Sequence, residues 1–185
     1  MRAIDIRDLL EHPGATRTVH LDESVEGLHT ELADVPADAP LAGDLQLESV
    51  VEGIFVTGSV GGRMTMRCAR CLKEFERDFD VEMHELFVRE AGPEDDYAIE
   101  PDLTLDPEPM VRDAVVLSMP FAPVCRPDCL GLCERCGGDR NLGECTCPPR
   151  VDPRWAGLVR FLHELDDPDH PDHPDDPGDR SPDRS

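Results

Sequence analysis

Apolar and polar residues alternate through the middle of the chain, which predicts antiparallel β-structure. The alternation begins in residues 45–60 and continues through residues 61–68. Between these segments, Gly61 and Gly62 form a pair typical of a tight hairpin turn. We therefore expect two strands joined at this glycine pair. The apolar positions of one parity are Ile54, Val56, Val60, Met64, Met66 and Cys68.

Residues 75–88 show the same period of two, with acids between the apolar residues. This pattern predicts a strand with one buried face. The turn that leads into it is the sequence CARCL, residues 68–72, and Thr16–Leu21 is a further candidate strand. Residues 91–105 are predicted to be an acidic loop. The face expected to be buried comprises Phe75, Phe79, Val81, Met83 and Phe87.

Two short helices are predicted after the strands. Asp106-Pro107 is a helix start signal, and Pro120 ends the segment. Asp152-Pro153 repeats the start signal, with Trp155 expected as a core anchor. The first apolar stripe is Met110, Val111, Ala114, Val115 and Leu117, and the second is Trp155, Leu158, Val159 and Leu162.

These elements predict an α+β fold. We expect an antiparallel sheet or partial barrel with two short helices and a C-terminal zinc-ribbon-like segment. Residues 1–105 would form the mainly β domain. Residues 106–165 would hold the helices and a cysteine-rich segment, packed on the sheet. Residues 166–185 are rich in Asp and Pro and are predicted to be disordered, because they cannot bury enough apolar surface.

Composition narrows the function classes. The 185 residues carry 18 Lys and Arg against 41 Asp and Glu, a net charge of −23. Such a chain is unsuited to coating nucleic acid through bulk charge. It also has no apolar run of membrane-spanning length and no apolar leader, which predicts a cytoplasmic protein with no membrane partner.

One segment, residues 63–77, carries net positive charge, with five bases against two acids. These bases are candidate RNA phosphate contacts. The alternative is a solvated strand face that balances neighbouring acids. The bases are Arg63, Arg67, Arg70, Lys73 and Arg77.

Eight cysteines in a chain without a secretory leader indicate metal binding or redox chemistry. The pair Cys133-x-x-Cys136 precedes a glycine, and two intervening residues let both sulfurs face one ion. Cys145-x-Cys147 follows closely enough to complete a tetrahedron. These four thiols predict a four-thiolate Zn²⁺ site.

The other four thiols form a candidate second site, for one or two Zn²⁺ ions in all. Cys68-x-x-Cys71 lies on the hairpin turn, and Cys125 and Cys129 lie downstream. Two rival arrangements remain: mixed ligand sets in which Cys129 replaces another cysteine, and a free Cys68/Cys71 dithiol. Because neighbouring arginines lower thiol pKa values, the free dithiol would make the protein a redox or zinc-release sensor.

A closed four-thiolate site has no open position for substrate, so it is structural. The sequence holds no catalytic motif for hydrolysis, deamination or nucleotide chemistry, and we expect no enzymatic activity and no small-molecule substrate. The enzymatic alternative would be Mg²⁺ binding by Asp95 and Asp96.

The order of several motifs resembles the YceD family, the large ribosomal RNA subunit accumulation proteins. The motifs are VVEGIFVTGSV, CARCL, LSMPFAPVC, CLGLCERCG, the Asn-Leu pair, CTC and DPRWAGL. The resemblance covers nearly all of residues 1–165, in the cysteine-rich version of the family. It implies a bacterial, cytoplasmic ribosome biogenesis factor needed for accumulation or processing of large-subunit (23S) ribosomal RNA. The implied partners are precursor ribosomal RNA, a basic ribosomal protein, or both.

Overall fold

The computed structural model describes residues 1–90, 92, 97–148, 152–155 and 158. Contacts divide the chain into two units, Met1–Cys145 and Thr146–Ser185. In the second unit the described helical segment is η1, Pro153–Trp155. The predicted tail, the residues Val159 and Leu162 of the predicted terminal helix, and the candidate Mg²⁺ ligands Asp95 and Asp96 lie outside the described residues. Trp155 is 58% exposed among the described residues, and its place as a core anchor stays a prediction.

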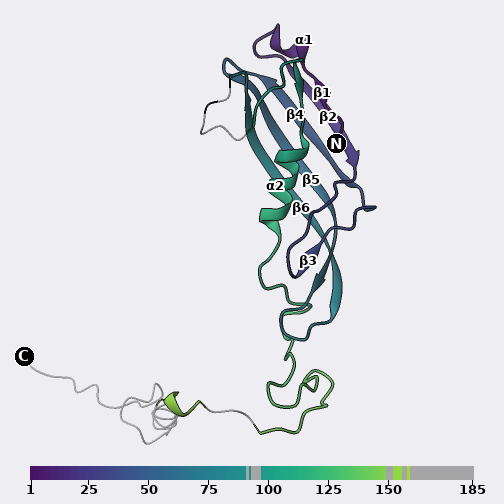
Figure 1. The fold of residues 1–185 in the computed structure, drawn as a ribbon, viewed down its shortest axis with the longest axis vertical. Coiled ribbons are helices and arrows are strands. Elements are labelled where there is room, and N and C mark those ends of the chain that lie inside the picture. The colour runs from purple at the N-terminus through teal and green to yellow at the C-terminus, as the bar shows by residue number, and fades with distance from the viewer. Residues whose placement is uncertain (91, 93–96, 149–151, 156–157, 159–185) are drawn as a thin grey trace, which may run out of the picture. The chain divides into compact units, whose positions relative to one another are not determined.

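The first unit is built on a five-stranded antiparallel sheet, with strand order β2-β4-β5 and with β3 and β6 also paired to β5 (Figure 1). A small second sheet pairs β1 with β7. The fold is therefore α+β with a mainly antiparallel sheet, as predicted. The strands are β1 (Ile4–Asp5), β2 (Thr16–Glu23), β3 (Ala33–Asp34), β4 (Leu41–Ser49), β5 (Gly53–Arg67), β6 (Glu74–Val88) and β7 (Thr104–Leu105).

The predicted turn at Gly61-Gly62 is wrong, because both glycines lie inside β5. The turn that precedes β5 is at residues 50–52, where the Val50 N–H donates to the Gly53 carbonyl. A Cβ on Gly62 would lie 2.9 Å from Leu41 Cδ2, and one on Gly61 would lie 2.9 Å from the Phe79 carbonyl oxygen. The glycines therefore permit close packing within a long strand.

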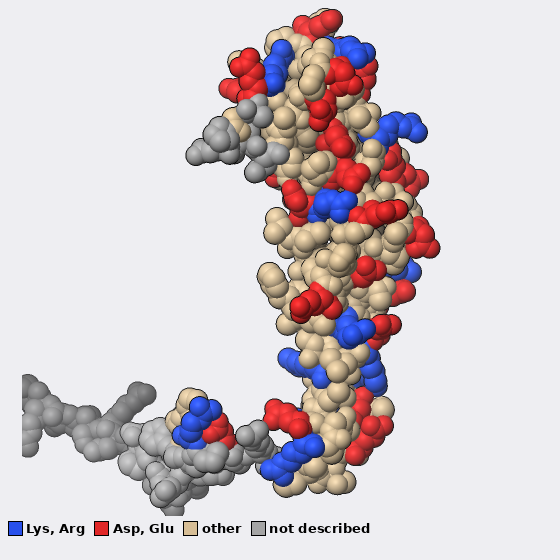
Figure 2. Space-filling view, in the orientation of Figure 1, with Lys and Arg blue, Asp and Glu red and all other residues tan. Residues whose placement is uncertain are grey.

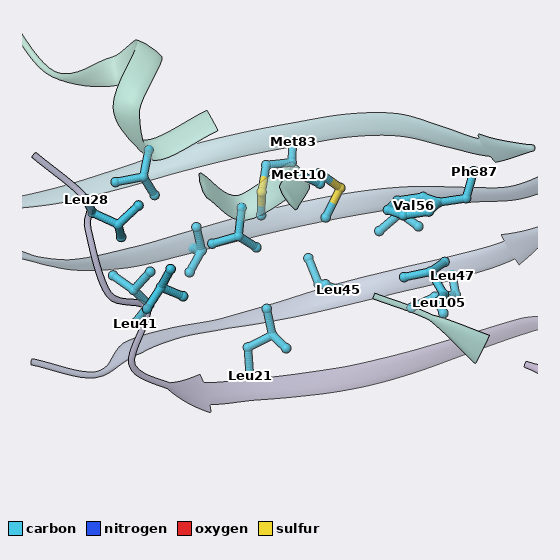
Figure 3. Close-up of a cluster of buried hydrophobic side chains, with 14 of the residues drawn as sticks. Leu21, Leu28, Leu41, Leu45, Leu47, Val56, Met83, Phe87, Leu105 and Met110 are labelled. Atoms are coloured by element: carbon cyan, nitrogen blue, oxygen red, sulfur yellow. The ribbon is translucent and has the colours of Figure 1, made fainter. Parts of the chain in front are cut away.

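The core is almost entirely aliphatic and lies on one face of the sheet. Met83 and Phe87 of β6 are buried, while Phe75, Phe79 and Val81 are half-buried, which confirms the alternation predicted for this strand. Figure 3 shows side chains from the long strands gathered with Met110. The labelled core residues are Leu21, Leu28, Leu41, Leu45, Leu47, Val56, Met83, Phe87, Leu105 and Met110.

Two α-helices accompany the sheet, α1 (Arg7–Leu10) and α2 (Glu108–Ser118). The Asp106 carboxylate accepts a hydrogen bond from the Glu108 N–H at the start of α2. Helix α2 packs on β6 through buried Met110, Val111 and Val115 (Figure 1). No helix among the described residues has the length and apolar character needed to cross a bilayer.

Leu117 is 83% exposed, so its predicted place in the buried stripe of α2 is wrong. Successive residues of an α-helix are about 100° apart around its axis. Leu117 therefore lies nearly a quarter turn from the centre of the buried stripe, at its margin. It lies in the last turn of the helix, where it borders an open groove beside β6.

Candidate metal centres

The turn between β5 and β6 presents two thiols to the same side. The Cys68 N–H donates to the Lys73 carbonyl at 2.9 Å, and the Leu72 N–H donates to the Cys68 carbonyl at 2.9 Å. Leu72 takes a left-handed conformation with φ of 60°, which tightens the turn. Two residues of spacing within this turn bring the sulfurs of Cys68 and Cys71 together.

The segment after α2 returns to this turn and supplies two more thiols. The Ala69 N–H donates to the Pro123 carbonyl at 2.8 Å, which fixes the approach of the returning chain. The Cys68 and Cys129 sulfurs are then 3.9 Å apart, and the Cys71 and Cys125 sulfurs are 3.7 Å apart. All four sulfurs lie within 4.8 Å of one another.

These separations suit a tetrahedral metal. Zn–S bonds of about 2.3 Å place sulfurs about 3.8 Å apart at tetrahedral angles. They also exceed the S–S bond length of about 2.05 Å, and all four cysteines are free. Of the arrangements considered from sequence, the geometry brings together the hairpin pair and the Cys125/Cys129 pair, a group we call the hairpin tetrad.

Burial and backbone N–H groups shift the thiol pKa values of the hairpin tetrad in opposite directions. Burial opposes ionisation of Cys68, but the backbone N–H groups of Cys125, Cys71 and Arg70 lower the pKa of its thiol to about 6. Burial and then the neighbouring thiols raise the pKa of Cys125 to about 12. One sulfur therefore ionises readily while another resists. A divalent cation would let all four become thiolates.

A second group contains the thiols predicted for the first zinc site. Cys133, Cys136 and Cys145 lie in the first unit, where their sulfurs lie within 4.8 Å of one another, and Cys147 belongs to the second unit. The Gly137 N–H donates to the Cys133 carbonyl at 2.9 Å, and Gly137 has φ of 71°, which is the glycine turn expected after the Cys-x-x-Cys pair. Backbone N–H groups of Cys136 and Arg135 lower the pKa of the Cys133 thiol to about 6.

Asn141 contacts the thiol groups, although it was not among the predicted site residues. Its side-chain oxygen accepts hydrogen bonds from the Leu130 N–H and from Arg126, each at 2.8 Å. Its side-chain nitrogen donates to Asp139 at 2.7 Å and to the Cys129 sulfur at 3.7 Å. Asn141 therefore ties the loop after Cys136 to the hairpin tetrad. The Asn-Leu pair in the family motifs was the only sequence signal for it.

Asp139 fastens the same loop to the hairpin. Its carboxylate lies 2.8 Å from the Lys73 ammonium and is nearly buried. Lys73, followed by Asn141, lowers the pKa of Asp139 to about 2. Gly131 lies under the hairpin turn, where a Cβ would be 2.8 Å from the Arg70 carbonyl oxygen. The cysteine-rich loops are thus packed directly on the β5–β6 turn.

The five bases proposed for RNA contact have intramolecular partners. Arg63 pairs with Asp78 at 3.0 Å, and Arg67 approaches Glu74 at 3.5 Å. Several Lys and Arg side chains are visible near the end of the sheet that carries this turn (Figure 2). The remaining three bases hold the returning chain: Arg70 donates to the Pro127 and Cys129 carbonyls, Arg77 donates to the Val124 carbonyl, and Lys73 pairs with Asp139. Their role in RNA contact stays a prediction.

Comparison with known proteins gives a consistent family assignment. The model of the large ribosomal RNA subunit accumulation protein YceD matches residues 56–162, a span that contains all eight cysteines. An uncharacterized protein of Mycobacterium tuberculosis is 39% identical over 171 residues, covering 89% of this chain and 83% of the relative. An uncharacterized protein of Mycobacterium leprae is 35% identical over 167 residues, covering 85% and 76%.

A relative with a functional name is more distant. A chloroplastic large ribosomal RNA subunit accumulation protein YCED homolog 1 from Zea mays is 40% identical over 50 residues, covering 26% of this chain and 17% of the maize protein. No solved structure matches the chain.

Proposed function

The chain belongs to the YceD family of large ribosomal RNA subunit accumulation proteins, and from this premise we propose that it is a zinc-stabilised scaffold for ribosome biogenesis. It acts in the cytoplasm and is needed for accumulation or processing of large-subunit (23S) ribosomal RNA. Its partners are precursor ribosomal RNA, a basic ribosomal protein, or both. It works by binding and does not catalyse a reaction.

One observation carries the structural part of this proposal. Four cysteines from segments more than fifty residues apart meet with sulfur separations of 3.7 and 3.9 Å. Those separations match a tetrahedral thiolate site, which has no open coordination position. Zn²⁺ in that site would stabilise the zinc-ribbon-like C-terminal segment and hold it on the sheet. The metal would serve the fold of a binding surface and take no part in chemistry.

The redox or zinc-release sensor needs a Cys68/Cys71 dithiol that an oxidant can reach. The low pKa of Cys68 favours reactivity, but both side chains are buried, at 0% and 5% exposure. Titration of thiols with a small alkylating reagent, with and without chelator, separates the two functions. Fast reaction of two thiols while metal remains bound would support the sensor. Protection of all eight until chelator is added supports the scaffold.

The cellular test is complementation of a strain that lacks the protein. The measurement is the ratio of 23S to 16S ribosomal RNA, and the wild-type chain is expected to restore it. Cys68→Ser and Cys125→Ser should fail to restore the ratio. Met64→Leu is a matched control because it is a volume-conserving change of a buried side chain near the same hairpin. A normal ratio in the empty strain would overturn the proposed function.

A further inference from the structure

Strand β6 has an open outer edge. It pairs with β5 along its whole length, from Gly53↔Val88 to Arg67↔Glu74. On its other edge, in the part of the chain that the structure describes, only Val88 is bridged, to Ala98. The backbone N–H and C=O groups of alternate residues of β6 before Val88 therefore face away from β5. Such an edge is a template for an additional strand.

A groove of about 490 Å³ follows this edge between β6 and α2. Successive side chains of a strand point to opposite faces. Five successive residues of β6, Val81 to Glu85, line the groove. Because their side chains alternate between faces, an unbroken run of lining residues indicates that the groove follows the strand edge itself. Leu117 of α2, with 83% of its surface exposed, supplies an apolar wall.

The charged side chains in the groove are all acidic. Glu82, Glu85 and Asp113 line it, with no Lys or Arg among the lining residues. The Asp113 carboxylate accepts a hydrogen bond from the Tyr97 hydroxyl, which fixes its position. Glu82 and Glu85 are exposed and make no ion pair with the described Lys and Arg residues. Figure 2 shows carboxylates spread widely over the surface of the sheet.

We propose that this groove binds a basic, extended segment of a partner polypeptide, which adds to the outer edge of β6 as a further strand. The partner backbone would hydrogen-bond to the free edge. Its Lys or Arg side chains would meet Glu82 on one face of the sheet, and its apolar side chains would rest on Leu117 on the other face. An RNA strand is disfavoured here, since phosphates would face carboxylates. The inference rests on the proposed function in one respect. That function names RNA and a basic protein as partners, and the inference assigns the basic protein to this groove.

The test uses the full-length, metal-loaded protein and a fluorescent peptide of about nine residues in which Arg alternates with Val, the length of a typical strand. Fluorescence anisotropy should show saturable binding that weakens as salt is raised. A peptide of the same sequence with N-methyl groups on alternate residues keeps the charge but loses the edge hydrogen bonds. It should bind at least about tenfold more weakly, since several backbone hydrogen bonds are lost.

Variants assign the binding to the groove. Glu82→Lys should weaken binding of the Arg-Val peptide about tenfold, because attraction becomes repulsion at the acid that the Arg side chains meet. Glu48→Lys is the matched control, an exposed acid on β4. Leu117→Asp should also weaken binding, whereas Val51→Asp, 87% exposed in the β4–β5 turn, should not. Equal affinity for the plain and N-methylated peptides, or equal effects of the groove and control variants, would overturn the proposal.

Two further outcomes separate this inference from the proposed function. A labelled single-stranded RNA that competes with the peptide for the groove would overturn the choice of a polypeptide partner. A deletion strain restored by the Glu82→Lys variant would show that the groove is not the site used in ribosome biogenesis, while the family function stands. If the protein binds the peptide but its deletion leaves ribosomal RNA unchanged, the groove is supported and the proposed function is overturned.

Discussion

The β-sheet and the cysteine segment, residues 120–145, are stabilised by different forces. The sheet buries a continuous aliphatic core, in which Leu45 and Val56 are fully enclosed. In the cysteine segment no large aliphatic side chain is fully buried, and Leu130 and Leu142 are exposed. The sheet can therefore fold by removing apolar surface from water. In the function we propose, metal–thiolate bonds and a few polar contacts hold the cysteine segment, so the two regions should respond differently to the same perturbation.

Loss of the hairpin tetrad should produce the largest difference in stability between the two regions. Cys129→Ser, or removal of metal with a chelator, should release the cysteine segment, since structural Zn²⁺ contributes on the order of 10 kcal/mol to such folds. Amide hydrogen exchange should become fast in residues 120–145 and stay slow in β4 and β5. Metal content should fall by one equivalent per chain in the variant. Unchanged metal content and unchanged protection would show that this tetrad does not bind metal.

The reverse experiment weakens the sheet alone. Leu45→Ala removes a fully buried side chain from β4 and should lower the free energy of unfolding by about 2–5 kcal/mol, through lost burial and a cavity. Chemical denaturation measures this change, and metal content should stay at the wild-type value. Gln46→Ala, an exposed neighbour, is the control. A loss of metal in Leu45→Ala would mean that the two regions unfold as one.

Asn141→Ala tests the polar contacts inside the cysteine segment. It removes hydrogen bonds to the Leu130 N–H, to Asp139 and to the Cys129 sulfur. Groups that orient ligands are typically worth about 10–100-fold in metal affinity, so we expect a loss in that range. Competition with a chromophoric chelator measures it. Leu142→Ala, an exposed neighbour, should leave the affinity unchanged, and an equal loss in both variants would contradict the role of Asn141.

Of these perturbations, acid should have the smallest effect on the stability of the sheet. The N-terminal ammonium of Met1, followed by Arg112, lowers the pKa of Glu108 below its ordinary value of 4.5. Because the folded pKa is depressed, this stabilisation is complete above about pH 4.5 and is lost as the pH falls through the lower, folded value. Glu108→Gln should therefore show a shallower loss of sheet stability in acid.

The cysteine segment should respond to acid at higher pH, because thiolate ligands must stay deprotonated to hold metal. A pH titration followed by metal release and by circular dichroism compares the two regions in one experiment. If metal is released at the same pH at which the sheet unfolds, the two regions do not respond separately to acid. If the acid transition of Glu108→Gln equals that of the wild type, the ion pair of Glu108 does not contribute to the stability of the sheet.

Short-range patterns were enough to predict much of this protein. The parity of Met83 and Phe87, the start of α2 near Asp106 and the Gly137 turn after Cys136 each depend on neighbouring residues, and the structure agrees with them. The turn predicted at Gly61-Gly62 was wrong because a glycine pair permits close packing within a strand as well as a turn. Only the position of Leu41 on a distant strand distinguishes these uses. The prediction that Leu117 is buried was wrong for a similar reason, because the width of the buried stripe depends on what α2 packs against.

The sequence by itself determined the family, the antiparallel sheet and the thiols available for metal, since these depend on residue types and local spacing. Tertiary structure alone decided that Cys68 and Cys71 meet Cys125 and Cys129, and that Arg70 and Lys73 hold the cysteine segment. It also left the outer edge of β6 open beside α2. These features join residues far apart in the chain, and no local pattern specifies which distant partner a side chain or a strand edge will find.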